Sequence, residues 1–378
     1  MSKDQNIQCG CNGDTGSHSQ SCCGEPDSVN AGFKGVPWIT GHITVSEGEI
    51  PAVSTRLTFG DILGSWKARW DIGRMDYKIP PGLYAVGIPD NNSPVLVSAN
   101  YKMSFDRLRR ELAGFNLWIL VLDTKGVNVW CAAGKGTFGT QELINRIARV
   151  RLQNIVTHRK LILPQLGAPG IAAHEVLKLS GFKVIYGPVR AKDLPAFLNA
   201  GNQATPEMRE VRFGIIDRMV LAPVELVGAI KPALIVIAVL FGMNLIMNGS
   251  AAFYTLLFRT LADFLPFLGA ILTGVFLVPA FLPYIPGRAL SFKGWLLGLL
   301  WAGAYLWLIS HAAGWKQITL YLLLLPPITS FLAMNFTGTT TYTSLSGVVK
   351  EMKVAVPAQI ISAGLGIVFM IAKMFIRF

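Results

Sequence analysis

The sequence predicts a Rossmann-like α/β domain followed by an all-α transmembrane domain of five helices. Over residues 94–200, short apolar runs typical of buried strands alternate with helical segments. This alternation is typical of parallel strands joined by crossover helices. The last 146 residues of the 378 contain eight basic and two acidic residues. So few charges exclude a single soluble domain and indicate a membrane region.

The elements of the α/β domain are predicted in order, within a domain expected to span residues 36–200. Residues 36–90 hold short alternating apolar runs with Pro and Gly, and they give no clear order of elements. Further along, Thr140 with an acidic residue in the following turn predicts the start of a helix. Strands are predicted at 95–97, 116–122, 161–163 and 183–186, and helices at 104–112, 140–152, 172–179 and 192–199.

The membrane region is expected to span residues 233–378. Its apolar runs each approach the roughly 20 residues that a spanning helix needs. Basic residues in the breaks between the runs give a weak positive-inside bias. We therefore expect a multi-pass protein of the cytoplasmic membrane, with the N-terminal domain in the cytoplasm. The five runs are 233–249, 261–282, 294–310, 318–336 and 354–375.

Residues 201–232 are expected to form an amphipathic connector between the two domains. Arg209, Arg212 and Arg218 lie along its amphipathic stretch. An anionic lipid surface attracts side chains of this kind. The lipid bilayer is therefore a predicted partner of the connector as well as of the spanning helices.

Residues 1–35 are a cysteine-containing leader with almost no apolar content, so we expect disorder there. Cys9, Cys11, Cys22 and Cys23 form C-x-C and C-C pairs. This spacing matches neither a zinc ribbon nor a ferredoxin cluster. Capture of a soft metal ion and a tail without any metal role both stay open. No apolar signal segment is visible, so we expect reduced thiols in the cytoplasm.

The net charge of +12 does not indicate a nucleic-acid-binding protein. In the N-terminal part basic residues alternate with acids, and no basic cluster is longer than two residues, such as Arg109-Arg110 beside Glu111. A nucleic-acid interface needs a concentrated basic face with aromatic residues between the charges. We therefore expect no nucleic-acid partner.

The stretch most informative about chemistry is residues 123–139, DTKGVNVWCAAGKGTFG, which follows a buried strand. Ligands of α/β domains bind at this edge of the sheet. Gly134, Gly136 and Gly139 match the dinucleotide fingerprint, but the acid expected about 20 residues further on is missing. A membrane transporter with a nucleotide-binding regulatory domain is therefore only a lesser functional alternative.

Cys131 stands alone in this stretch and has two interpretations. A free cysteine is most often a small buried hydrophobic residue. Cys131, however, lies in a Gly-rich segment at the ligand edge, after Trp130 and before Ala132 and Ala133. An aromatic ring and small neighbours suit a large planar ligand, which favours Cys131 as a ligand-binding residue.

Residues 128–135, NVWCAAGK, resemble the signature of the HgcA family, the membrane-bound corrinoid protein of microbial mercury methylation. The resemblance continues in SANYKMSFDRLR, HRKLILPQLGAPG and YGPVRAKDLP. An α/β domain followed by spanning helices also matches the layout of that family. The resemblance implies a corrinoid-binding α/β domain with a cobalamin-type cofactor, in which Cys131 is the catalytic residue and the lower axial ligand of cobalt.

The resemblance also implies which residues surround the corrinoid. The signature is expected to form a helix against the lower face of the corrin, and loops at strand ends are expected to meet its polar side groups. The expected cofactor-binding residues are Asn128, Val129, Trp130, Cys131, Ala132, Ala133, Gly134, Lys135, Gly136, Thr137, Gly167, Ala168, Gly187 and Pro188.

The function implied by the resemblance is a methyltransferase that transfers a cobalt-bound methyl group to Hg(II) and releases methylmercury. A ferredoxin-like iron–sulfur protein of the HgcB type is the implied electron donor, and the implied methyl donor is linked to methyltetrahydrofolate. The alternative is a methyl-carrier corrinoid protein of acetyl-CoA-type anaerobic one-carbon metabolism.

Overall fold

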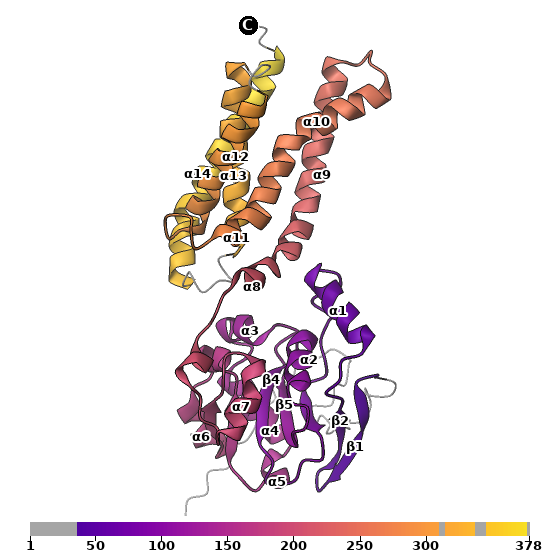
Figure 1. The fold of residues 1–378 in the computed structure, drawn as a ribbon, viewed down its shortest axis with the longest axis vertical. Helices are drawn as coiled ribbons and strands as arrows, with labels where there is room; N and C mark the ends of the chain where they lie inside the picture. The colour runs from indigo at the N-terminus through magenta and orange to yellow at the C-terminus, as the bar shows by residue number, and fades with distance from the viewer. Residues whose placement is uncertain (1–35, 310–313, 337–344, 376–378) are drawn as a thin grey trace, which may run out of the picture.

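The computed structural model describes residues 36–309, 314–336 and 345–375. An α/β domain and a helical region are stacked along the long axis of the molecule, with helix α8 (Ile215–Met219) between them (Figure 1). The leader cysteines Cys9, Cys11, Cys22 and Cys23 lie outside the described residues, so metal capture by the leader stays a prediction.

The α/β domain is built on a seven-stranded mixed sheet with the strand order β1-β2-β3-β5-β4-β6-β7. Strands β5, β4, β6 and β7 are parallel, whereas β3 runs antiparallel to β5. The strands are β1 (Ile39–Val45), β2 (Gly48–Val53), β3 (Gly82–Val86), β4 (Val95–Ala99), β5 (Leu117–Leu122), β6 (Lys160–Leu163) and β7 (Lys183–Tyr186).

Helices cover both faces of this sheet. The α-helices are α1 (Phe59–Arg69), α2 (Lys102–Arg110), α3 (Val129–Lys135), α4 (Thr140–Arg149), α5 (Leu152–Ile155), α6 (Ala173–Ser180) and α7 (Leu194–Asn199). Two 3-10 helices, η1 (Gln165–Gly170) and η2 (Ala191–Asp193), complete the connections.

The predicted α/β alternation is confirmed over residues 94–200. All four predicted strands are present, and β7 has the predicted bounds. The helix predicted at 140–152 is too long, because α4 ends at Arg149 and α5 begins at Leu152. Arg151, between them, has a φ of 48°, and a non-glycine residue in this left-handed region interrupts a helix.

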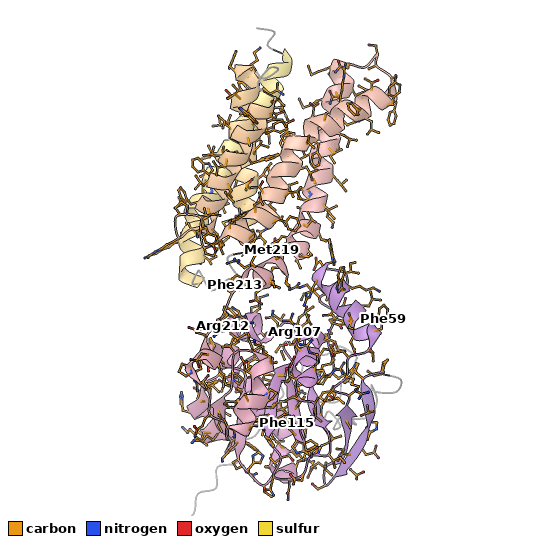
Figure 2. The ribbon with its side chains drawn as sticks, viewed as in Figure 1. Phe59, Arg107, Phe115, Arg212, Phe213 and Met219 are labelled. Carbon is orange, nitrogen blue, oxygen red and sulfur yellow. The ribbon has the colours of Figure 1, made fainter. Side chains whose placement is uncertain are left out.

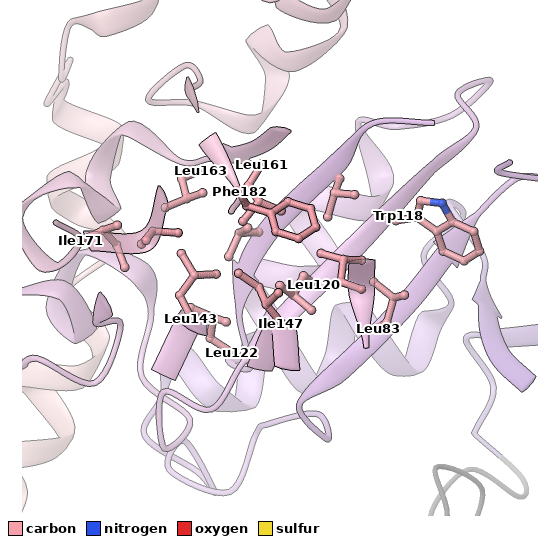
Figure 3. Close-up of a cluster of buried hydrophobic side chains, with 14 of the residues drawn as sticks. Leu83, Trp118, Leu120, Leu122, Leu143, Ile147, Leu161, Leu163, Ile171 and Phe182 are labelled. Atoms are coloured by element: carbon pink, nitrogen blue, oxygen red, sulfur yellow. The ribbon is translucent and has the colours of Figure 1, made fainter. Parts of the chain in front are cut away.

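Strand β5 is buried on both faces of the sheet, as expected for a central strand covered by helices. Trp118, Leu120 and Leu122 pack on one face with Leu143 and Ile147 of α4 (Figure 3). The alternate β5 residues pack on the opposite face with α2 and α7. This double burial fixes the register of β5, and with it the position at which the following loop leaves the sheet.

Among the described residues, four helical segments are long and apolar enough to cross a membrane: Ile215–Met247, Phe253–Phe281, Trp315–Asn335 and Gly347–Ala372. The prediction of five spans is not confirmed. The predicted run 294–310 falls in α12 (Leu290–Leu308), whose mean hydropathy is lowered by Lys293 near its start and by several Trp and Tyr residues.

The other elements are η3 (Pro206–Arg209), α9 (Ala222–Met247), α10 (Phe253–Leu272), η4 (Thr273–Leu277), α11 (Val278–Phe281), α13 (Trp315–Asn335) and α14 (Leu345–Phe375).

Small residues let the helices of this region approach closely. A Cβ added at Gly269 would lie 1.9 Å from the Trp301 ring, and one at Gly298 would lie 2.7 Å from the Pro326 Cα atom. Close approach at glycine is the usual way in which membrane helices pack.

The connector between the two parts is bound to the helical region, which its amphipathic pattern did not predict. Arg218 is buried, and its guanidinium donates a hydrogen bond to the Ala280 carbonyl oxygen at 3.1 Å. It is therefore not available to a lipid surface, and that expectation is wrong. Arg212 is exposed and lies at the end of the α/β domain that faces the helices (Figure 2).

Candidate functional site

The candidate site lies at the carboxyl edge of the parallel strands. The chain passes from β4 to β5 on one side and then crosses to β6 on the other side of β4. The winding therefore reverses at β4, and ligands of open α/β sheets bind at such a switch point. This edge, with α3 above it, faces α8 and the helical region (Figure 1).

Asn100, directly after β4, holds the loop that follows β5. Its side-chain carbonyl oxygen accepts hydrogen bonds from the backbone N–H groups of Thr124 and Gly126, at 3.1 and 3.0 Å. Asn100 and Thr124 are both buried. Gly126 has a φ of 73°, and a Cβ there would lie 2.8 Å from the Met75 carbonyl oxygen, so only glycine fits. The loop is thus fixed directly before α3.

Helix α3 begins at a side-chain cap that also fixes Cys131. The Asn128 carboxamide oxygen accepts a hydrogen bond from the Cys131 backbone N–H at 2.9 Å. Asparagine is among the preferred residues at this position because it satisfies a free N–H group of the first turn. At the other end, Gly136 has a φ of 79° and ends the helix.

One face of α3 packs into the domain. Ala132 and Ala133 are buried, and α3 contacts η1. A Cβ added at Gly170 would lie 3.1 Å from the Ala133 Cα atom and 2.1 Å from the Phe138 carbonyl oxygen. The two alanines were expected on the corrin-facing side, but the structure places them against the protein, where they allow this close contact.

The opposite face of α3 carries Trp130, Cys131 and Gly134. Trp130 and Cys131 are half-buried, Gly134 is exposed, and a Cβ added at Gly134 would meet no atom within 4 Å. A glycine inside a helix costs about 1 kcal/mol relative to alanine, and packing within the described residues does not require it here. Open space beside a half-buried thiol fits close approach by a large planar group such as a corrin.

The other predicted site residues fall into two groups. Lys135 and Gly136 are exposed at the end of α3, and Val129, Thr137 and Ala168 are half-buried. Gly167, Gly187 and Pro188 are buried and shape the strand ends instead of an open surface. A Cβ at Gly167 would lie 2.5 Å from the Phe138 ring, which gives this glycine a packing role.

Gly134, Gly136 and Gly139 do not form the strand-to-helix turn of a dinucleotide site. Gly134 lies within α3, Gly136 ends that helix, and Gly139 precedes α4. A dinucleotide fingerprint places its glycines directly between a strand and the helix that binds the phosphates. The geometry therefore gives no support to the transporter with a nucleotide-binding domain.

A buried charge cluster, which the sequence pattern did not predict, holds α1 against α2. The Lys102 Nζ atom lies 2.6 Å from Asp61 Oδ1 and 2.7 Å from Asp106 Oδ1. Arg109, fully buried, lies 2.7 Å from Asp61 Oδ2 and 2.8 Å from Asp106 Oδ1. Two cations and two anions compensate one another, so the cluster stabilises the fold and offers no free acid or base. Asp106, four residues after Lys102 and three before Arg109 on α2, was its only sequence signal.

The cluster gives the α/β domain an expected acid transition. Burial alone would raise the pKa of Asp61, but hydrogen bonds from Lys102 and Thr58 outweigh it and hold that pKa at about 2, below the ordinary 3.8. Because the folded pKa is lowered, the stabilisation is complete above pH 3.8 and is lost as the pH falls toward 2. Acid titration followed by circular dichroism should show this loss, and Asp61→Asn should remove it. An unchanged acid transition in Asp61→Asn would contradict the assignment.

The structure thus combines an α/β domain with a short cysteine-bearing helix at the carboxyl edge of its parallel strands. The family described as CO dehydrogenase/acetyl-CoA synthase delta subunit matches residues 74–198. This segment contains β3 to β7 together with α3.

Curated relatives match a quarter to a third of the chain. The acetyl-CoA decarbonylase/synthase complex subunit gamma of Methanopyrus kandleri is 32% identical over 127 residues, which are 33% of this chain and 27% of the relative. The subunit gamma of Methanocaldococcus jannaschii is 33% identical over 97 residues, 25% of this chain and 20% of the relative. The corrinoid/iron-sulfur protein large subunit of Moorella thermoacetica is 28% identical over 125 residues, 32% of this chain and 28% of the relative. The chain thus spans about a quarter of the length of these relatives.

Proposed function

We propose that this chain is a methyl-carrier corrinoid protein, with the outward face of α3 against the corrinoid and the Cys131 sulfur as the lower ligand of cobalt. The observation that carries the proposal is the half-buried Cys131 thiol on the outward face of α3, beside the open space at Gly134. The names of the relatives, corrinoid/iron-sulfur protein large subunit and acetyl-CoA decarbonylase/synthase subunit gamma, support a corrinoid and a place in one-carbon metabolism.

The residues around Cys131 have defined tasks in this proposal. A bound corrinoid supplies a cobalt that accepts and releases methyl groups, and its axial ligand tunes its electronic properties. Asn128 fixes the backbone of Cys131, and Asn100 fixes the loop before it. Trp130 offers an apolar surface beside the thiol. Gly134 leaves room for the ring system, and Ala132 and Ala133 anchor the helix from below.

The proposed location is the cytoplasmic membrane, with the α/β domain on the cytoplasmic side. The four long apolar helical segments support insertion. We also propose that reduction of the cofactor depends on a separate ferredoxin-like iron–sulfur protein of the HgcB type. The methyl donor is proposed to be linked to methyltetrahydrofolate.

Hg(II) is the second candidate acceptor of the methyl group. Two features favour it: the NVWCAAGK signature at 128–135 and the thiol that the structure places on the outward face of α3. The Cys131 sulfur would donate more electron density to a bound corrinoid than an imidazole would. The corrinoid would then supply a methyl group with its bonding electron pair, which a soft cation such as Hg(II) accepts. Separate incubations of the methylated protein with Hg(II), a thiol and a nickel acceptor distinguish the two functions. A methyl carrier should methylate the thiol or the nickel acceptor and form no methylmercury, whereas a mercury methyltransferase should form methylmercury.

A substitution at Gly134 tests the proposed corrinoid face. Gly134→Leu should leave the fold intact, because its Cβ meets no atom within 4 Å. It should weaken hydroxocobalamin binding by about 1–3 kcal/mol, the usual cost of overfilling a packed contact, or roughly 5- to 150-fold. Titration of the full chain in detergent, followed by cobalamin absorption, measures this change.

Lys160→Leu is the control, because Lys160 is exposed at the opposite edge of the sheet. Its affinity for hydroxocobalamin should match that of the unaltered chain. Equal affinities in Gly134→Leu and the unaltered chain would exclude a corrin on this face of α3. NAD, titrated in parallel, should not bind.

A further inference from the structure

Helix α1 exposes its apolar face and turns its opposite face into the protein. The side chains at positions 59, 62, 63, 66 and 70 follow the spacing of one helix face, and all five are large, apolar and exposed. Phe59 is 79% exposed and Trp66 is 62% exposed. The opposite face turns Asp61 and Ala68 into the protein. A helix on the surface of a soluble domain normally does the reverse. The name α1 surface is used below for Phe59, Ile62, Leu63, Trp66 and Trp70.

The α1 surface is held outward by firm contacts on the inner side of the helix. Asp61 is bound by Lys102 and Arg109 and closes a capping box with Thr58. A Cβ added at Gly64 would lie 2.7 Å from the Tyr77 ring. Rolling the helix to hide its apolar residues would therefore break a buried charge cluster, so the exposed face is a fixed property of the fold.

The α1 surface lies at the end of the α/β domain that carries the helical region. Figure 1 shows α1 beside the start of α9. Asp71 and Arg74, in the turn after α1, interact electrostatically with Glu225 in the first turn of α9. The turn after α1 thus lies near the first turn of α9, within the first candidate spanning segment, Ile215–Met247.

We propose that the α1 surface lies in the interfacial layer of the bilayer, in the leaflet next to the α/β domain. Its residues suit this layer, since tryptophan prefers the boundary between headgroups and acyl chains. Lys67 and Arg69 flank the apolar stripe, and the acid on α1, Asp61, is buried. A helix of this composition buries its apolar face about 5–10 Å into the boundary. The inference rests on insertion of the helical region, which is part of the proposed function.

Lipid contact is tested with a fluorophore attached at single cysteines of the full chain in liposomes. The five native cysteines are replaced by serine, and no corrinoid is added, so the result does not depend on the cofactor. Ile62→Cys probes the α1 surface. Ile235→Cys, exposed on α9, probes insertion, and Lys160→Cys, at the far edge of the sheet, is the matched control. Circular dichroism checks the fold of each variant.

The expected result is several-fold stronger quenching at position 62 than at position 160 by lipids with a nitroxide near the headgroup. A water-soluble nitroxide should show the opposite order. Quenching at 235 without quenching at 62 would overturn the inference and leave membrane insertion standing. Shielding of position 62 from both quenchers would also overturn it, because a protein surface would then cover α1. No lipid quenching at 62 or 235 would mean that insertion itself fails.

Discussion

Replacement of Cys131 by alanine is expected to lower the rate of methyl transfer by about 10²-fold or more. This value is the upper end of the usual loss when a group that supports a metal centre is removed. The backbone N–H of residue 131 still donates to Asn128, so α3 should persist in Cys131→Ala. The variant should therefore fold and bind hydroxocobalamin, but with a shifted cobalt absorption spectrum. Absorption spectroscopy and a single-turnover methyl-transfer assay on the purified full chain measure both effects.

The leader cysteines provide the matched control for this experiment. A variant in which Cys9, Cys11, Cys22 and Cys23 are all serine retains Cys131 as its single thiol. Its cobalt spectrum should match that of the unaltered chain. An unchanged spectrum in Cys131→Ala would remove the Cys131 sulfur from the coordination sphere. An unchanged methyl-transfer rate would remove its role in the reaction as well.

Arg109→Ala is expected to destabilise the α/β domain by about 3–5 kcal/mol, the usual result of removing one partner from a buried ion pair. Arg109 is fully buried and contacts Asp61 and Asp106. Its loss leaves the two carboxylates with Lys102 as their remaining cation within the cluster. Hydrogen exchange of the α1 and α2 amides reports this loss locally, which avoids treating the full chain as a two-state system.

Arg110→Ala is the matched control, because the neighbouring arginine is exposed and pairs only with Glu111 among the described residues. A surface pair contributes about 0–1 kcal/mol, so the control should exchange almost as slowly as the unaltered chain. Equal effects of the two substitutions would contradict the stabilising role of the buried cluster.

The sequence predicted the parallel half of the sheet because its physical signal is local. Residues 117–122 form an uninterrupted apolar run, and burial on both faces of β5 is the reason for that pattern. The antiparallel strands β1 and β2 could not be ordered, because β1 alternates half-buried and exposed residues in a Gly-rich setting. Helix α1 was not predicted, although its apolar residues have helical spacing, and the sequence alone could not show that this stripe faces outward.

The helix that carries Cys131 was predicted, and the binding role of its residues stays a prediction. Cys131 and its signature mark the helix, and the structure adds which of its faces is open. Which face points outward depends on Gly170 and Phe138, which pack against α3 from later in the chain. Asn100 was missed for the same reason: its hydrogen bonds cross from β4 to the loop after β5. Contacts between residues this far apart in the sequence follow from the topology of the sheet, and a local sequence pattern does not show them.

The tether between the two parts of the molecule sets how other molecules reach α3. Arg190 pairs with Asp217 at 2.9 Å, and the Val189 N–H donates to the Met208 carbonyl oxygen at 2.8 Å. These bonds keep the carboxyl edge turned toward the helices. Under the proposed function, a protein that delivers electrons or methyl groups would therefore reach α3 from the side of the α/β domain. The width of such a protein where it meets α3 would then decide whether it fits, whereas a small ion would not be limited in this way.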